Sequence, residues 1–404
     1  MKKSIVISND ASLYFSKRFN TFTTNDILFF FALLTIIISI SASIRIVSVL
    51  PVNAAVYAIV LSLMARNFRT DKNIRIGILL TSFLSVYALI AALINPLFLG
   101  IYTVRLLFIF IVITVFLNLR LSKKILNFMS AIMIPIICYY TIKSWSFVEV
   151  FKNSNELASN YMNSNPNSMG LIILFAFMIA DRGKLLRNRL MWILISAISG
   201  IGLINYGSRN ALVCFFAYIL ISKLFSRLSF NKIKTIYLVI LAAALLFPVL
   251  YVGYYNQIYD SRDSIIVLDK DIYSGRQDIW IGALDSDSAL NLIVGNSNLE
   301  LLNYLPSKSL HNMYIDIGFR LGYVFLILFM AFLFYLITRD RNAPHRLHAS
   351  IVVLLIYGYF ETTLFSGSYA AMLMLLIFIY DHNSKFKLSN FSSDSKLTKV
   401  QVDE

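Results

Sequence analysis

Long apolar runs alternate with short polar segments along most of this chain. About twelve of the runs are long enough to span, or nearly span, a membrane hydrocarbon core of ~30 Å. They lie near residues 27–48, 51–64, 76–96, 101–118, 125–143, 168–180, 190–206, 209–222, 235–253, 312–338, 349–363 and 367–380. The pattern predicts an all-α, polytopic integral membrane protein.

Two polar segments interrupt this pattern. The shorter one, from Trp145 to Ser168, contains NSNPNSMG and is expected to form an outer loop that starts a helix. The longer one runs from Tyr254 to Leu310 and contains SGRQDIW (274–280). It is followed directly by His311 and Asn312. Loops of this length commonly carry function, so we expect the functional site to lie there.

Composition agrees with a membrane protein, because 58% of the residues are hydrophobic and only 14% are charged. A soluble domain has about half apolar and about a quarter charged residues. The two cysteines, Cys138 and Cys214, lie inside apolar runs. Neither a disulfide framework nor a zinc site is therefore expected, and no motif indicates a cofactor.

The net charge of +15 would suggest nucleic-acid binding if the basic residues were not so unevenly placed. With a cytoplasmic N-terminus, 26 of the 36 lysines and arginines fall in cytoplasmic segments, as the positive-inside rule predicts. No nucleic-acid partner is expected. The predicted order is a cytoplasmic segment (1–26), helices one to nine (27–253), a long loop on the outer side of the membrane (254–311), helices ten to twelve (312–382) and a cytoplasmic tail (383–404).

Arginines outside the cytoplasmic segments are candidates for substrate binding. Arg105, Arg209 and Arg320 lie at or near the predicted outer ends of spans. An ionisable group at such depth is costly and marks a functional site by default, although a single one can also extend to the headgroups. Guanidinium groups bind phosphate oxygens in a forked geometry. Several of them on one side favour a site for a doubly charged anion.

Arg276 has local support from its neighbours. Ser274 and Gln277 have the spacing of a capping box, and the apolar residues that follow predict a short amphipathic helix on the membrane surface. Arg276 would lie in the first turn, where free N–H groups favour anions. A plain interfacial helix is the alternative.

Three residues near the late spans could take part in proton transfer or ion pairing. His311 is the one histidine of four that falls outside the predicted cytoplasmic segments, and it could hold or accept a proton near neutral pH. A helix-capping role is the alternative. We expect Asp316 to pair structurally with an arginine. For Glu361, pairing and a role as a base both remain open.

Five motifs together resemble the O-antigen ligase and O-antigen polymerase superfamily of bacterial envelopes. They are NPN (165–167), GSRNAL (207–212), GRQDIW (275–280), the sequence HN followed by nine residues and Gly322, and YFE (359–361). The resemblance covers spans six to twelve. It implies a GT-C-like helical bundle whose cavity opens to the periplasm.

The resemblance also implies a metal-independent glycosyltransferase that uses undecaprenyl-diphosphate-linked glycans, without a cofactor. Arg209 and Arg276 would hold the diphosphate, and His311 would assist the acceptor hydroxyl. Glu361 completes the expected catalytic set. The expected substrate-binding residues are Arg105, Arg320, Asn312 and Asn167.

We expect an O-antigen polymerase of the bacterial inner membrane, which transfers a growing lipid-linked chain onto a lipid-linked repeat unit. A chain-length regulator is a further candidate partner. The first alternative is a ligase that transfers the polysaccharide to lipid A-core. Phe325 weighs against it, because ligases usually have a small residue or tyrosine three positions after the glycine. A lipid-linked sugar flippase and a purely structural membrane protein are weaker alternatives.

Overall fold

The computed structural model describes residues 72–94, 123–153, 166–258, 266–267, 270–271, 280, 289–295, 312–338, 344–359 and 361. Their regular secondary structure is helical apart from one antiparallel pair of two-residue strands, β1 (Ile266–Val267) and β2 (Lys270–Asp271). The predicted all-α class is therefore confirmed for this part of the chain. The predicted spans at 27–48, 51–64, 101–118 and 367–380 lie outside the described residues, as do segments 1–26 and 383–404.

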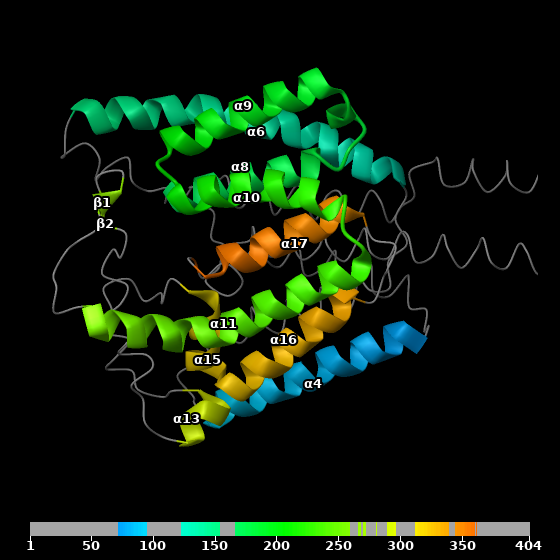
Figure 1. Cartoon of the computed structure of the whole chain (residues 1–404), viewed down its shortest axis with the longest axis vertical. Coiled ribbons are helices and arrows are strands. Elements are labelled where there is room, and N and C mark those ends of the chain that lie inside the picture. The colour runs from blue at the N-terminus through cyan, green and yellow to red at the C-terminus, as the bar shows by residue number, and fades with distance from the viewer. Residues whose placement is uncertain are drawn as a thin grey trace, which may run out of the picture. The chain divides into compact units, whose positions relative to one another are not determined.

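The described helices belong to two compact units (Figure 1). The first unit contains α6 (Lys123–Asn153), α8 (Pro166–Ala180), the 3-10 turn η2 (Leu185–Arg187), α9 (Arg189–Asn205) and the start of α10 (Arg209–Phe225). The helix α8 is its core, because every residue from Met169 to Ala180 is buried. A helix that is apolar on all sides needs such burial. Both α6 and α9 pack against α8.

The second unit contains α4 (Lys72–Ile94), the rest of α10, α11 (Phe230–Ile258), α13 (Ala289–Val294), α15 (Met313–Leu321), α16 (Tyr323–Thr338) and α17 (His345–Tyr357). The helix α16 packs against both α4 and α11 (Figure 1). All nine residues of α15 are buried. This short helix, rather than a long span, lies at the centre of the unit.

The prediction of one continuous span over 312–338 is wrong, because the chain breaks at Gly322. Its φ of 90° and ψ of 151° lie in a region that residues with a Cβ rarely adopt. The break also requires Gly318, since a Cβ there would lie 2.7 Å from Cε1 of Tyr323. Two glycines thus let α16 start directly against the end of α15.

Several other boundaries differ from the predicted ones. The predicted outer loop 145–168 is partly helical, because α6 continues to Asn153 and α8 begins at Pro166. The helix α11 extends to Ile258, so the long polar segment begins later than predicted. That segment also contains α13 and the β1–β2 pair, neither of which the sequence pattern indicated.

Within the described residues, one stretch meets the combined length and hydropathy criteria for a membrane span: Asn127–Ser146 of α6. Five other described helical stretches are apolar but shorter. The twelve-span topology therefore remains a prediction. Many large apolar side chains are nevertheless exposed on the helices, among them Leu79 (70%), Leu190 (77%) and Leu220 (68%).

Candidate functional site

Two of the motifs meet in the first unit. The segment NPNSMG supplies the first turn of α8, and GSRNAL supplies the first turn of α10. Gly170 of α8 lies so close to Ser208 that an added Cβ would be 2.3 Å from the serine Oγ. The beginnings of the two helices are therefore in direct contact.

This contact brings a predicted catalytic residue, Arg209, and a predicted substrate-binding residue, Asn167, to neighbouring positions. Arg209 is the first residue of α10 and directly follows Ser208. Asn167 lies one turn before Gly170, on the same face of α8. Both side chains are partly exposed. Both residues lie in the first turn of a helix, where the helix dipole favours an anion.

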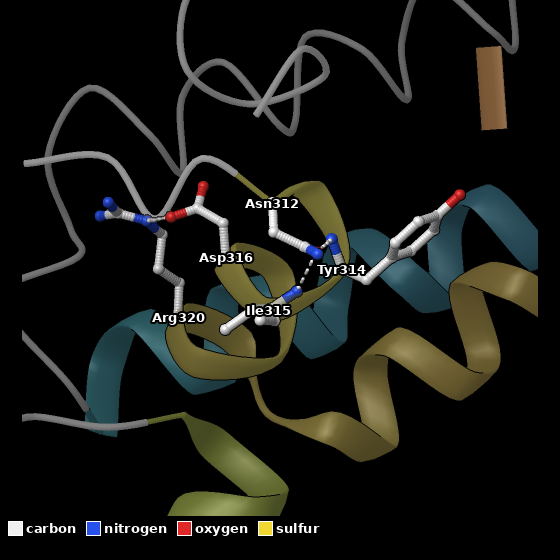
Figure 2. A network of polar contacts seen from close by, with 5 residues as sticks. All are labelled: Asn312, Tyr314, Ile315, Asp316 and Arg320. Atoms are coloured by element: carbon white, nitrogen blue, oxygen red, sulfur yellow. Dashed lines mark hydrogen bonds and ion pairs between the residues drawn. The ribbon is translucent and has the colours of Figure 1, made fainter. Parts of the chain in front are cut away.

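The second unit contains the other pair of motifs. Asn312 is fully buried and is the N-cap of α15 (Figure 2). Its Oδ1 accepts hydrogen bonds from the backbone N–H groups of Tyr314 at 2.9 Å and Ile315 at 3.0 Å. Asparagine is among the preferred N-cap residues because it satisfies such N–H groups. The asparagine of the HN motif therefore has a structural role, which is to cap α15.

The other end of the Asn312 amide reaches the YFE motif. Its Nδ2 donates to the carbonyl oxygen of Tyr359 at 3.0 Å, across 47 residues of sequence. Glu361 lies two residues further along, partly exposed, and its backbone N–H donates to the carbonyl oxygen of Tyr357 at 3.2 Å. The structure therefore places Asn312 and Glu361 at one junction, where α17 ends and α15 begins.

Arg320 does not stand alone inside α15. Its Nε donates to Oδ1 of Asp316 at 2.8 Å, and both side chains are buried. The expected structural pairing of Asp316 with an arginine is what the structure contains. Figure 2 shows this pair on one side of α15 and the ring of Tyr314 extending from another side. Substrate binding by Arg320 stays a prediction.

Three predicted site residues, Arg105, Arg276 and His311, lie outside the described residues. Trp280, at the end of the GRQDIW motif, is helical and buried. In the part of the chain that the structure describes, no three His, Cys, Asp or Glu side chains gather as a metal site requires.

Sequence reasoning did not single out Gly170, Ser208 or Gly358 as parts of the two junctions. Gly358 packs against Met313, because an added Cβ would lie 2.8 Å from the methionine Cε. Small residues that let helices approach closely are a known signal in membrane proteins, and each of these lies within or beside a motif. That signal marks residues at both junctions, but it does not say which helix end lies opposite which.

No protein-family model, curated protein or solved structure matches this chain.

Proposed function

We propose that this protein is a membrane glycosyltransferase that polymerises undecaprenyl-diphosphate-linked oligosaccharides at the outer face of the cytoplasmic membrane. The growing glycan is the donor, and a lipid-linked repeat unit is the acceptor. This proposal starts from the motifs that resemble the O-antigen polymerases and ligases.

The observation that carries the proposal is the pairing of motifs that are distant in sequence. NPNSMG and GSRNAL meet through Gly170 and Ser208 in the first unit. In the second unit, the HN motif contacts the end of YFE through Asn312 and Tyr359. These motifs were selected for their polar residues, and helix packing alone gives no reason for them to contact one another. A functional site that forms at such a junction does require this contact.

The position of these junctions within their helices gives further support. Asn167, Arg209 and Asn312 begin helices, and Glu361 follows the end of α17. In the predicted topology all four lie at outer ends of spans. The opposite end of α8 in the first unit leads into a polar turn that contains Arg182, Lys184 and Arg187. A basic turn at that end is what a cytoplasmic location predicts.

A lipid environment is supported by the exposed apolar side chains. On α10, Val213 (60% exposed), Phe216 (54%) and Leu220 (68%) are spaced by three and four residues, so they share one face of the helix. Soluble proteins seldom leave large apolar faces uncovered, whereas a lipid-facing helix has no such restriction. Such faces would lie against acyl chains.

In the proposed reaction, a sugar hydroxyl of the acceptor attacks the anomeric carbon of the donor glycan. The bond from that carbon to the diphosphate oxygen breaks, and undecaprenyl diphosphate leaves with the bonding electron pair. Arg209 and Arg276 hold the diphosphate and stabilise its growing charge. His311 orients the acceptor hydroxyl. The proton of that hydroxyl passes to His311 or Glu361.

Purified protein in lipid vesicles provides a direct test. It is supplied only with undecaprenyl-diphosphate-linked repeat units, and the lipid-linked products are analysed by mass spectrometry. We expect a series of products that differ by one repeat-unit mass, together with released undecaprenyl diphosphate. If products form only when lipid A-core is added, the enzyme is a ligase. Translocation of intact lipid-linked units without any new glycosidic bond would identify a flippase.

A further inference from the structure

Asn312 is expected from the sequence to bind substrate, but both ends of its amide already bond to the backbone. The side chain is 0% exposed, its oxygen receives two backbone hydrogen bonds and its nitrogen donates to the carbonyl of Tyr359. A primary amide carries an acceptor oxygen and a donor nitrogen on two separate atoms, so it can bond in two directions at once. Asn312 uses one of them for α15 and the other for the end of α17.

Two further hydrogen bonds fix the same junction. The N–H of Met313, the first residue of α15, donates to the carbonyl oxygen of Gly358 at 2.8 Å. The hydroxyl of Tyr314 donates to the carbonyl oxygen of Leu355 at 2.7 Å. The rings of Tyr314 and Tyr359 pack with their centroids 5.0 Å apart.

These bonds join groups that a helix leaves without partners. The first N–H groups of α15 and the last carbonyls of α17 cannot be satisfied within their own helices. At this junction the start of α15 and the end of α17 satisfy each other. In a buried or lipid-covered location neither set could turn to water instead, so the junction is under strong constraint.

We infer that Asn312 is a positioning residue and not a substrate ligand: its carboxamide locks the end of α17, and so places Glu361 beside the start of α15. The inference rests on the proposed function in one respect, which is that Glu361 acts on the substrate. Glu361 follows Tyr359 by two residues, and its own N–H is bonded to Tyr357. A shift of the Tyr359 carbonyl therefore moves Glu361 with it.

The substitution Asn312→Asp tests the nitrogen of the amide separately from its oxygen. Aspartate caps a helix as well as asparagine does, so the bonds to α15 can remain. The nitrogen that donates to Tyr359 is replaced by an oxygen, which opposes the carbonyl oxygen and pushes the end of α17 away. Asn312→Ser is the second variant, because it keeps a neutral cap but is too short to reach Tyr359.

Asn188 provides a matched control. It is the N-cap of α9, and its Oδ1 accepts from the N–H groups of Leu190 at 2.9 Å and Met191 at 3.5 Å. It is exposed, and no bond from its nitrogen joins it to another helix in the described part of the chain. Asn188→Asp should therefore leave both activity and local exchange unchanged.

Two measurements are made on the full-length protein in lipid vesicles: steady-state transfer with lipid-linked repeat units, and hydrogen exchange of the backbone amides at 358–361. For both Asn312 variants we expect kcat to fall ~10- to ~100-fold, since a misplacement of about 1 Å can cost this much. KM should stay within about twofold, because a residue that does not touch substrate changes little in ground-state binding. The amides of Gly358, Tyr359 and Glu361 should exchange roughly 3- to 10-fold faster.

The inference is overturned if the variants raise KM but leave kcat and hydrogen exchange unchanged, because Asn312 would then bind substrate. It is also overturned if both variants keep wild-type kcat. Hydrogen exchange does not depend on the reaction, so it still decides whether the amide fixes residues 358–361 if the wild-type protein transfers no glycan. A wild-type protein that transfers no glycan would contradict the proposed function alone.

Discussion

Nε of Arg320 lies 2.8 Å from Oδ1 of Asp316, one helical turn earlier on α15, with both side chains buried (Figure 2). The acidic residue precedes the basic one by four positions, which is the orientation that also suits the helix dipole. Within the pair the two charges cancel. Arg320 can therefore be buried in an apolar unit without a net charge.

Removing the negative partner should destabilise the second unit strongly. Asp316→Asn removes the carboxylate that the buried Arg320 guanidinium bonds to, and breaking a buried ion pair typically costs about 3–5 kcal/mol. We expect a clearly lower thermal unfolding midpoint in detergent and a lower yield of inserted protein.

The double substitution Asp316→Leu with Arg320→Met distinguishes a structural pair from a binding site. Replacing both charges with apolar groups of similar size is often neutral or stabilising. This variant should recover most of the stability. If the double variant also retains full glycan transfer, Arg320 does not bind substrate. If Asp316→Asn alone unfolds at the wild-type temperature, the ion pair does not stabilise the protein.

The contact between α8 and α10 predicts a pair of compensating substitutions. Gly170→Ala places a methyl group 2.3 Å from Oγ of Ser208, so the two helix starts must separate. Overpacking of this kind costs about 1–3 kcal/mol and should lower transfer, because it displaces Arg209. Adding Ser208→Gly removes both the Oγ and the Cβ that clash, and should restore much of the loss.

Gly200→Ala is the control for this experiment. Gly200 lies inside α9, and beyond the neighbouring backbone of its own helix nothing lies within 4 Å of an added Cβ. Alanine is favoured over glycine in a helix interior by about 1 kcal/mol, so this variant should be neutral or more stable. An equal loss from Gly170→Ala with and without Ser208→Gly would contradict the packing described here.

Arg209 should depend on its fork and not only on its charge. Arg209→Lys keeps the positive charge at the start of α10 but cannot form two parallel bonds to a phosphate. We expect transfer to fall at least ~10-fold, which corresponds to about 1.4 kcal/mol. Arg227, exposed beyond the other end of α10, is the control, and Arg227→Lys should have wild-type activity. Equal activity of the two lysine variants would exclude forked phosphate recognition by Arg209.

The helices α9 and α10 were the easiest part to predict from the sequence. Spans expected at 190–206 and 209–222 are close to α9 (Arg189–Asn205) and to α10 (Arg209–Phe225). Polar residues around Asn188 and the turn at Gly207 mark both boundaries. Apolar periodicity and a polar break on each side were sufficient there.

The break at Gly322 was missed because apolar residues lie directly on both sides of it, Leu321 before the glycine and Tyr323 after it. A helix end was still indicated locally, since Arg320 lies in the last turn of α15 and Gly322 follows it. The Asn312–Tyr359 bond could not be predicted at all. It joins residues that are far apart in sequence, and no local pattern records which helix end lies opposite another.

His311→Ala should abolish most glycan transfer while the protein still inserts and still binds the lipid-linked donor. General acid–base assistance is typically worth ~10²–10⁴-fold. A sugar hydroxyl is too weak an acid for imidazole to ionise fully, so the role includes orientation by a hydrogen bond. His311→Gln should then keep part of the activity. Normal long chains from His311→Ala would remove His311 from the mechanism and leave Glu361 as the base.

The most direct test of the central claim is the chain-length profile of surface polysaccharide in a strain from which the gene for this protein is deleted. A polymerase defect predicts single repeat units attached to lipid A-core, and the wild-type gene should restore the ladder of long chains. Bare core with accumulating lipid-linked polymer would identify a ligase instead. An unchanged ladder in the deletion strain would contradict a role in this polysaccharide altogether.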